Sequence, residues 1–574
     1  MLTRWGRDLD PDDPLPDYPR PQLVRPHWVN LNGPWECAFT RSPERPASFE
    51  HRIVVPFSPE APLSGVGRQL QPDEWLWYRR RFTAPGTPPG GRVLLHFGAV
   101  DQSCTVFVNG HEAGGHVGGY LPFTLDITGV LAGGGDELLE VRVRDPSESA
   151  AHARGKQRLD RGRIWYTAQS GIWQTVWLEP VPATYVEDLL VVPDLRTDTF
   201  EVTVAVAVDH EVEVAVGDHT VRGTTNAPVR VTVPGARRWS PEDPQLHGVR
   251  VRLADDRVTS YAAMRSFGTA TDPDGHPRLL LNGEPRQHVG LLDQGYWPDG
   301  LLTPPSDAAM VHDIETAKRL GFTMLRKHVK VEPLRWYHHC DRLGMLVWQD
   351  MVNGGRRYRH LVTGLPATRP VRLSDRRYGL FGREDAEARS EFRDEVRRTV
   401  RLLRSAPCVV VWTPFNEGWG QFDAALVAAE VAILDPTRPV NHVSGWIDQG
   451  GGDIRSHHCY VRRWRVPRGA RRDSRVLALT EYGGYDLRVP DHVWGDGEDA
   501  GHGYRSFTSR EELAQAFVDL HHDVVGPTVA QGLAATVYTQ LTDVEDELNG
   551  LLTYDREVLK IPAETVRSAL AHLR

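Results

Sequence analysis

The first third of the chain alternates short apolar runs with turns rich in glycine and proline. Many of these runs alternate apolar with polar positions, which is the spacing of a half-buried β-strand. The sequence VNG at 108–110 separates two such runs and signals a tight hairpin. Many short strands at this spacing predict a β-sandwich for residues 1–182. Its clearest strand candidates are 75–85, 92–98, 103–114 and 172–181.

The next segment, residues 183–267, continues the strand pattern more cleanly. The run EVTVAVAVDHEVEVAV at 201–216 and the run VRVTVPG at 229–235 alternate with a period of two residues. One face of each strand is therefore expected to be buried while the other face meets water. We expect a second, immunoglobulin-like β-sandwich here.

After Gly268 the period changes from strand to helix. The segment 306–321 begins with a serine suited to cap a helix, carries apolar residues at helical spacing and ends at Gly321. A short apolar strand follows, and this helix-then-strand unit recurs along the chain. Repeated units of this kind predict a (β/α)8 TIM barrel for residues 268–574. Its strands are expected near 287–291, 323–327, 346–350, 408–414, 440–444, 453–459, 476–480 and 534–539.

Polar side chains mark the ends of these predicted strands. In a TIM barrel the carboxyl ends of all eight strands meet at one face, where the active site lies. The sequence therefore predicts a single cleft that contains Arg326, His328, Asp350, Asn416, Glu417, His458 and Glu481.

The amino-acid composition indicates the class of protein to which the chain belongs. A chain of 574 residues is long enough for several domains, and its 40% hydrophobic and 25% charged residues are typical of a soluble protein. The 67 basic and 76 acidic side chains give a mildly acidic balance, which does not favour nucleic-acid or membrane partners. The 17 tryptophans match or outnumber the 16 tyrosines and 16 phenylalanines. Indole rings suit the apolar faces of sugars, although most of these rings are expected in the cores.

The five cysteines are odd in number and form no CxxC pair, so we expect free thiols and a cytoplasmic location. The start of the chain lacks an apolar signal core, and no run of 18 apolar residues is found.

Two glutamates carry the chemistry that we expect of this cleft. Glu417 ends the apolar strand VVVWTPFNE, and Glu481 ends VLALTE; glycines follow both. Two carboxylates at one barrel face are what glycoside hydrolysis needs, one to protonate the leaving oxygen and one to attack the anomeric carbon. The alternative is that each glutamate only pairs with an arginine of the barrel.

The segments VVVWTPFNEGWG and LTEYGGY resemble the acid/base and nucleophile motifs of glycoside hydrolase family 2. This family contains β-galactosidases, β-glucuronidases and β-mannosidases. The resemblance runs from about residue 25 to the end of the chain, and 108–128 and 170–181 resemble the family's jelly-roll sugar-binding domain. The segments 322–351 and 537–557 resemble its TIM barrel.

The resemblance implies a role for each matching residue. Glu417 is expected to be the acid/base and Glu481 the nucleophile of a retaining reaction, with their carboxyl groups about 5–5.5 Å apart. Asn416 is expected to bind the hydroxyl beside the anomeric carbon, and Arg326 to orient the nucleophile. His458 and Tyr460, in DIRSHHCY, resemble the sixth-strand motif that lines the cleft.

Further candidates for substrate contact are His288, Asp350, Trp446 and Tyr485, which sit at predicted strand ends. For each of them a purely structural role is expected equally. The acidic run DVEDE at 543–547 could indicate a metal, but we expect it to cap and solvate a helix after strand eight. No calcium-loop spacing is present, so neither a metal nor a cofactor is expected.

The substrate is inferred from departures from the family pattern. The Asn and Lys that clamp a glucuronide carboxylate are not found. Trp165 stands where pyranoside-cleaving relatives place an aspartate. We therefore expect an exo-acting enzyme on a terminal neutral sugar of galactose type, as a β-D-galactofuranoside or β-D-galactopyranoside. The alternatives are an α-L-arabinofuranosidase, a β-glucuronidase, an inverting hydrolase and a non-catalytic carbohydrate-binding protein. A small carbohydrate or glycoside is the expected partner, and assembly into a homo-oligomer is left open.

Overall fold

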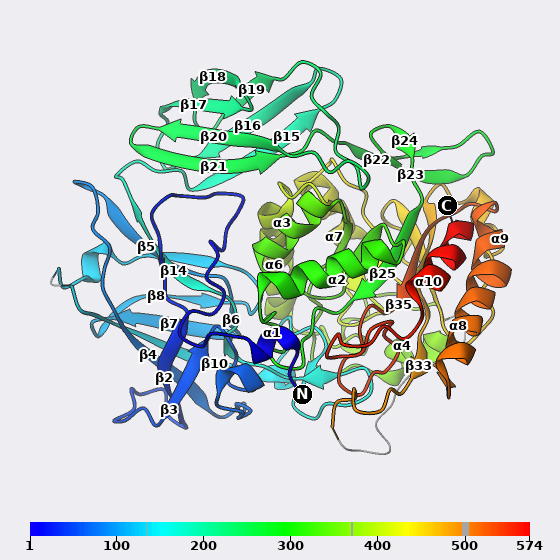
Figure 1. Cartoon of the computed structure of the whole chain (residues 1–574), viewed down its shortest axis with the longest axis horizontal. Coiled ribbons are helices and arrows are strands. Elements are labelled where there is room, and N and C mark those ends of the chain that lie inside the picture. The colour runs from blue at the N-terminus through cyan, green and yellow to red at the C-terminus, as the bar shows by residue number, and fades with distance from the viewer. Residues whose placement is uncertain (134, 369–370, 496–503, 574) are drawn as a thin grey trace.

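The computed structural model describes residues 1–133, 135–368, 371–495 and 504–573, arranged as two β-sandwiches and a barrel (Figure 1). The first sandwich is drawn in blue and cyan at the left, the second in teal and green at the top, and the barrel occupies the centre and right. Among the described residues, no helix combines the length and the apolarity that crossing a membrane requires.

Two antiparallel sheets form the first sandwich and enclose a core that includes Trp35, Tyr78 and Val141. Alternate residues of β7 and β10 are buried, as the period of two predicts. One sheet contains, in order, β1 (Val29–Asn30), β14 (Val176–Val181), β5 (Arg92–Phe97) and β9 (Phe123–Asp126). The other contains β3 (His51–Val55), β2 (Gly33–Thr40), β4 (Trp75–Phe82), β10 (Glu137–Arg144), β7 (Ser103–Val108) and β8 (His111–Val117).

The second sandwich packs two sheets around a valine-rich core. The long alternating run at 201–216 is divided between them, because residues 206–210 turn the chain from one sheet to the other. Its assignment as immunoglobulin-like stays a prediction. The sheets are β15 (Asp188–Asp194), β16 (Thr199–Ala205) and β19 (Pro228–Thr232), facing β18 (His219–Thr224), β17 (Glu211–Val216), β20 (His247–Leu253) and β21 (Asp256–Ala262).

A small three-stranded sheet lies between the second sandwich and the barrel. It consists of β22 (Phe267–Thr271), β23 (Pro277–Leu281) and β24 (Glu284–Pro285). The predicted boundary between residues 267 and 268 therefore falls within β22.

The barrel strands follow one another in chain order and are parallel, and the first strand, β25, pairs with both the second, β26, and the last, β35. The fifth strand, β30, is short and pairs with β29, while a bridge from Trp412 to Val440 extends the contact. The strands are β25 (His288–Asp293), β26 (Met324–Lys327), β27 (Leu346–Asp350), β28 (Val409–Thr413) with β29 (Phe415–Asn416), β30 (Val443–Ser444), β31 (Ile454–Cys459), β32 (Val476–Gly483) and β35 (Leu533–Thr539).

Helices cover the barrel on most of its circumference. Ser306 accepts a hydrogen bond from the Ala309 amide and caps α2, as its position in the sequence predicts. Residues 445–453 join β30 to β31 without a helix, so this flank of the barrel lacks a covering helix. The helices are α2 (Asp307–Arg319), α3 (Leu334–Leu343), α6 (Ala386–Leu403), α7 (Ala424–Leu434), α8 (Arg510–Asp519) and α10 (Ala563–Leu570).

The first sandwich docks on the barrel through the segment that follows β10. The amides of Arg154 and Gly155 donate to the Asn353 carbonyl at 3.1 and 2.9 Å. The Asn353 side chain accepts from the Asn416 amide at 2.9 Å. This chain of hydrogen bonds connects the first sandwich to the end of the fourth barrel strand.

Gly354 allows this docking because a β-carbon there would lie 1.8 Å from the His152 carbonyl oxygen. Gly354→Ala should therefore lower the free energy of unfolding by about 1–3 kcal/mol, since backbone must move to admit the methyl group. Denaturant unfolding followed by fluorescence measures the change. Gly268→Ala is the matched control, because a β-carbon at Gly268 meets no described atom within 4 Å. Equal stability of both variants would contradict the tight docking.

Candidate active site

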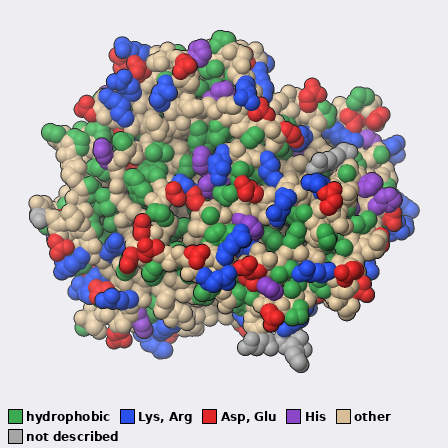
Figure 2. Space-filling view, viewed as in Figure 1, with side chains coloured by type: hydrophobic (Ala, Val, Ile, Leu, Met, Phe, Trp, Pro, Cys, Tyr) green, Lys and Arg blue, Asp and Glu red, His purple; other side chains and the backbone are tan. Residues whose placement is uncertain are grey.

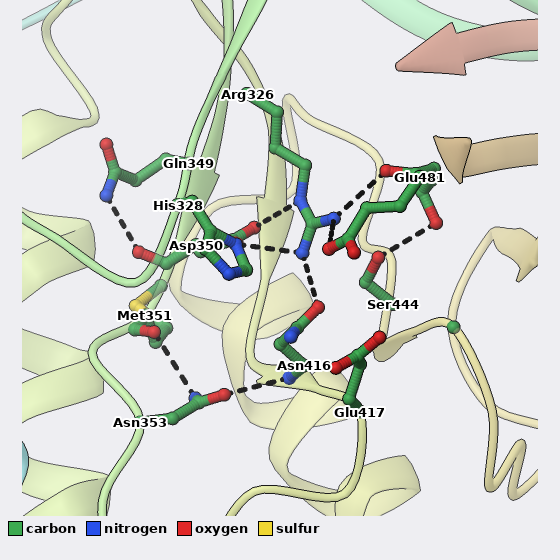
Figure 3. Close-up of polar contacts among 12 residues, drawn as sticks. Arg326, His328, Gln349, Asp350, Met351, Asn353, Asn416, Glu417, Ser444 and Glu481 are labelled. Carbon is green, nitrogen blue, oxygen red and sulfur yellow. Dashed lines mark hydrogen bonds and ion pairs between the residues drawn. The ribbon is translucent and has the colours of Figure 1, made fainter. Parts of the chain in front are cut away.

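A fully buried arginine lies at the centre of the group of polar residues at the carboxyl end of the barrel (Figure 3). Arg326, on β26, donates to both oxygens of Asp350 at 3.1 and 2.8 Å. It also donates to Glu481 Oε1 at 2.9 Å and to Asn416 Oδ1 at 2.8 Å. Its guanidinium thus ties together the second, third, fourth and seventh strands. The predicted contact between Arg326 and Glu481 is present.

Glu481 is held in its ionised form by its neighbours. Burial alone raises the pKa of this carboxyl, but the charges of His458, Arg326 and His328 together lower it to about 2. The Tyr460 hydroxyl adds a hydrogen bond to Glu481 Oε2 at 2.6 Å. A carboxylate that stays ionised at neutral pH, with one oxygen directed to the cleft, can act as a nucleophile.

Glu417 has the opposite electrostatic environment. Burial and the nearby charge of Glu481 raise its pKa, against the opposing effects of His458 and Lys156. Its backbone has φ of 50°, a left-handed conformation uncommon for a residue with a side chain, and its amide donates to the Ser444 carbonyl at 3.0 Å. A carboxyl with a raised pKa next to an ionised one is the arrangement that separates an acid from a nucleophile.

His458 lies between the two glutamates. Its Nδ1 is 2.7 Å from Glu417 Oε1 and 3.3 Å from Glu481 Oε2. Its Nε2 is 2.8 Å from the Ser444 hydroxyl, which donates to Thr480 Oγ1 at 2.8 Å. Because the Ser444 hydrogen is used on Thr480, Nε2 carries the hydrogen that bonds to Ser444, and Nδ1 faces the carboxylates.

Ligand atoms of Glu417, His458 and Glu481 all lie within 4.8 Å of one another. Within the described parts of the chain, this is the one group of three such residues with spacing suited to a metal. The acidic run 543–547 is not part of any such group.

His328, directly after the second strand, and Asp350, at the end of the third, hold Arg326 in position. His328 Nδ1 lies 3.0 Å from Asp350 Oδ2, and burial lowers the pKa of this histidine. Asp350 uses its oxygens on Arg326 and His328, so it holds the arginine in place. His328 also meets the ring of Trp419, with 5.8 Å between centroids.

Aromatic rings border this polar group on three sides. Trp165, from the first sandwich, packs against Trp419 with centroids 5.2 Å apart. Trp446 lies edge-on to His458 at 5.3 Å. Tyr460 stacks on Tyr504 at 3.8 Å. The predicted residues Trp165 and Trp446 therefore do lie beside the cleft.

Lys156 is a second contribution from the first sandwich, on the segment just before β11 (Gln157–Arg158). Its ammonium donates to the Tyr166 hydroxyl at 3.1 Å and lies 3.5 Å from Glu547 Oε2. The Tyr166 hydroxyl in turn donates to Glu547. Lys156 is buried, and its charge reaches both Glu417 and His328.

Two predicted contacts need correction. His288 is the first residue of β25, at the amino end of the barrel, where its Nδ1 accepts from Trp348 Nε1 at 3.0 Å. It therefore lies at the face opposite the glutamates. Tyr485, on β33 (Tyr485–Leu487), packs against Phe507 and Arg505 on the side of α8, because the two preceding glycines redirect the chain.

The acidic run 543–547 also differs from its prediction. It begins no helix, since the next helix after β35 is α10. Three of its four carboxylates, those of Asp543, Glu545 and Glu547, are buried in a loop and have protein partners. Asp543 accepts from Lys560 at 2.7 Å, and Glu545 accepts from the Thr167 amide at 3.0 Å.

The structure adds site residues that the sequence reasoning missed, namely Lys156, Trp419, Ser444, Tyr504 and Glu547. Trp419 and Ser444 could have been found, because Trp419 lies two residues after Glu417 and Ser444 ends a predicted strand. Lys156 and Glu547 lie on loops of different regions and carry no local signal.

Comparison with known proteins identifies related sequences. The family described as glycosyl hydrolase 2 galactose-binding domain-like matches residues 67–174, and the glycosyl hydrolases family 2 TIM barrel domain matches 306–466. A beta-galactosidase of Aeromonas hydrophila is 25% identical over 559 residues, which cover 83% of this chain and 50% of that protein. A beta-glucuronidase of Rattus norvegicus is 25% identical over 420 residues, covering 64% and 59%.

The chain spans about half the length of the curated relatives it matches. Among solved structures, a beta-glucuronidase of an uncultured Clostridium sp. superposes with a TM-score of 0.74 at 17% identity. The match covers 95% of this chain and 98% of that one. This likeness shows that the two chains share a fold.

Removal of the central arginine should change the pH dependence of activity. As the predicted nucleophile, Glu481 would act only when ionised, so we expect activity to be present above its pKa and to be lost as the pH falls through it. Without Arg326 that pKa rises, and Arg326→Met should move the acidic limb of kcat/KM upward by about one pH unit or more. Arg326→Lys keeps the charge, so its limb should stay closer to that of the wild type.

Arg265→Met is the control, because Arg265 is also buried but donates to the Pro407 carbonyl far from the glutamates. Arg265→Met should lower the free energy of unfolding without moving the acidic limb of kcat/KM. An unchanged acidic limb in Arg326→Met would show that Arg326 does not set the ionisation of Glu481.

Proposed function

The chain belongs to glycoside hydrolase family 2, and on that premise we propose that it is a retaining exo-glycosidase. Its proposed substrate is a terminal neutral sugar of galactose type, in a β-D-galactofuranoside or β-D-galactopyranoside. The observation that carries the proposal is the pair Glu417 and Glu481, with opposite pKa shifts and side-chain atoms within 4.8 Å. This spacing favours retention, because inversion needs a carboxyl gap of about 6.5–9.5 Å to admit water.

In the first step Glu481 attacks the anomeric carbon while Glu417 gives its proton to the departing oxygen. The bond to the aglycone breaks, and a covalent glycosyl-enzyme forms. Arg326 keeps Glu481 ionised and aimed, and Tyr460 bonds its second oxygen. Asn416 Nδ2 has no hydrogen-bond partner in the described structure, so it is free to donate to the neighbouring sugar hydroxyl.

In the second step Glu417, now ionised, removes a proton from water, and the water oxygen attacks the anomeric carbon. Glu481 leaves as a carboxylate, so the sugar is released with its original configuration. His458 Nδ1 lies 2.7 Å from Glu417 Oε1 and stabilises that ionised acid/base between the two steps when it carries a hydrogen as well.

A neutral sugar is supported by the charge balance of the cleft. Arg326 and Lys156 are the buried cations beside the glutamates in the described structure, and both already have carboxylate partners. Arg326 is bound by Asp350 and Glu481, and Lys156 lies 3.5 Å from Glu547. Neither of these two cations is therefore left unpaired for a sugar carboxylate. Trp165 closes one side of the cleft with an apolar ring, which suits a sugar face and an exo mode of action.

The two glutamates should behave differently when each is replaced. Glu481→Ala should abolish formation of the glycosyl-enzyme, and azide should rescue it to give a glycosyl azide of inverted configuration. Glu417→Ala should retain activity on substrates with good leaving groups and lose it on poor ones, because only poor leaving groups need protonation. Rates on a nitrophenyl series of varied leaving-group pKa measure this. The same leaving-group dependence in both variants would contradict these roles, and no activity in any wild-type assay would favour a non-catalytic binding protein.

A panel of nitrophenyl glycosides tests the sugar. We expect galactose-type and arabinose-type glycosides to be hydrolysed, with furanosides cleaved at least as well as pyranosides. A kcat/KM for a β-glucuronide above that for every neutral sugar would refute the neutral-sugar proposal. A tenfold preference for the galactopyranoside, about 1.4 kcal/mol in the transition state, would refute the furanoside preference.

A further inference from the structure

A large hollow opens on the flank of the barrel where the helix between β30 and β31 is absent. Its volume is about 950 Å³, within the size range of ligand sites. Its walls are the connection 445–449 together with β31, the segment 371–374 and the segment 462–467. The Gln449 side chain donates to the Leu373 carbonyl at 2.9 Å and joins the first two walls.

The hollow is strongly basic, although the chain as a whole has a net charge of −9. Among the described residues, its lining contains a single acid, Asp448. That acid is already bound by Arg475 at 2.9 Å and by His442 at 3.0 Å. The arginines of the lining are Arg372, Arg455, Arg462, Arg463 and Arg465.

Three of these arginines have side chains with no hydrogen-bond or ion-pair partner among the described residues. Arg455 lies 3.4 Å from Asp473, and Arg463 donates to the Asp523 carbonyl. Arg372, Arg462 and Arg465 are exposed, and their guanidinium groups have no hydrogen-bond or ion-pair partner in the described structure. Elsewhere on the surface, basic and acidic side chains are interspersed, as the face in Figure 2 shows. The hollow is therefore a local excess of unpaired positive charge.

The inner end of the hollow reaches the catalytic group. Trp446 and His458 both line it, and His458 Nδ1 lies 2.7 Å from Glu417 Oε1. If Glu417 protonates the leaving oxygen, as the proposed function requires, the aglycone departs on the side of Glu417. The hollow lies on that side, because Ile447 of its lining would lie 3.6 Å from a β-carbon at Gly418, the residue after Glu417.

We propose that this hollow binds the aglycone and selects one that carries an anionic group, a carboxylate or a sulfate ester on the sugar beyond the scissile bond. The inference rests on the proposed function and adds the chemistry of the leaving half of the substrate. Guanidinium groups bind carboxylate and sulfate through paired N–H donors, and Trp446 offers a ring on which the first aglycone sugar packs. The substrate is then a neutral sugar at the end of an acidic oligosaccharide.

The experiment compares three substrates that share one terminal sugar, the one cleaved best in the nitrophenyl panel. This sugar is linked to glucose, to glucuronic acid or to glucose 6-sulfate. The wild type should prefer an acidic aglycone to glucose by about tenfold or more in kcat/KM, and the preference should shrink at high salt. The two acidic substrates show whether carboxylate or sulfate is favoured.

The variant carries Arg372→Gln, Arg462→Gln and Arg465→Gln. It should lose most of the preference for acidic aglycones while its kcat/KM on the nitrophenyl glycoside stays unchanged. The control carries Arg52→Gln, Arg222→Gln and Arg252→Gln, on exposed positions of the two sandwiches, and has the same net charge. It should keep the full preference, which excludes a general effect of charge.

Equal rates on all three substrates in the wild type, or loss of the preference in the control as well, would overturn the inference. Failure of the proposed function is seen separately, as inactivity of the wild type on every nitrophenyl glycoside. In that case calorimetry with an oligouronate tests the hollow directly. Binding by the wild type and the control, lost in the triple variant, supports an anion site, and absence of binding refutes it.

Discussion

The site depends on one buried cation, the guanidinium of Arg326. Removing such a group from water costs free energy that only close, well-oriented partners offset. Arg326 has such partners on three other strands, Asp350, Asn416 and Glu481. Each bond fixes the relative position of two strand ends, so the geometry of the catalytic group and the closure of the barrel support each other. Removing Arg326 would leave two acids uncompensated in the interior.

The ion pair between Arg326 and Glu481 also makes the pKa values of the two glutamates differ. Both are buried, and burial raises the pKa of each. The difference comes from their partners, because Glu481 contacts Arg326 and Tyr460 while Glu417 does not. The negative charge held on Glu481 then raises the pKa of Glu417 further. One arginine thus favours an ionised carboxylate on strand seven and a protonated one on strand four.

The sequence predicted this group well because parallel strands place their last residues at one face. Glu417, Glu481 and Arg326 each follow an apolar run, His458 lies in a motif that resembles the family's sixth strand, and the structure brings the four together. The same reasoning failed for His288, because this residue begins its strand instead of ending it. Its side chain therefore lies at the face of the barrel opposite the glutamates. Lys156 and Glu547 could not be predicted, because they meet through the docking of two separately folded regions, and local patterns carry no information on such contacts.

The two sides of the cleft are built differently. On one side the first sandwich brings Trp165 and Lys156 against the barrel, where Gly354 lets the backbones meet closely. On the other side the connection 445–453 carries no helix, and the barrel flank stays open. A closed side suits a single terminal sugar, while an open side lined by unpaired arginines leaves room for a longer, acidic partner. The proposed exo mode and the proposed aglycone preference therefore have the same cause: some parts of the barrel are covered by the rest of the chain and others are not.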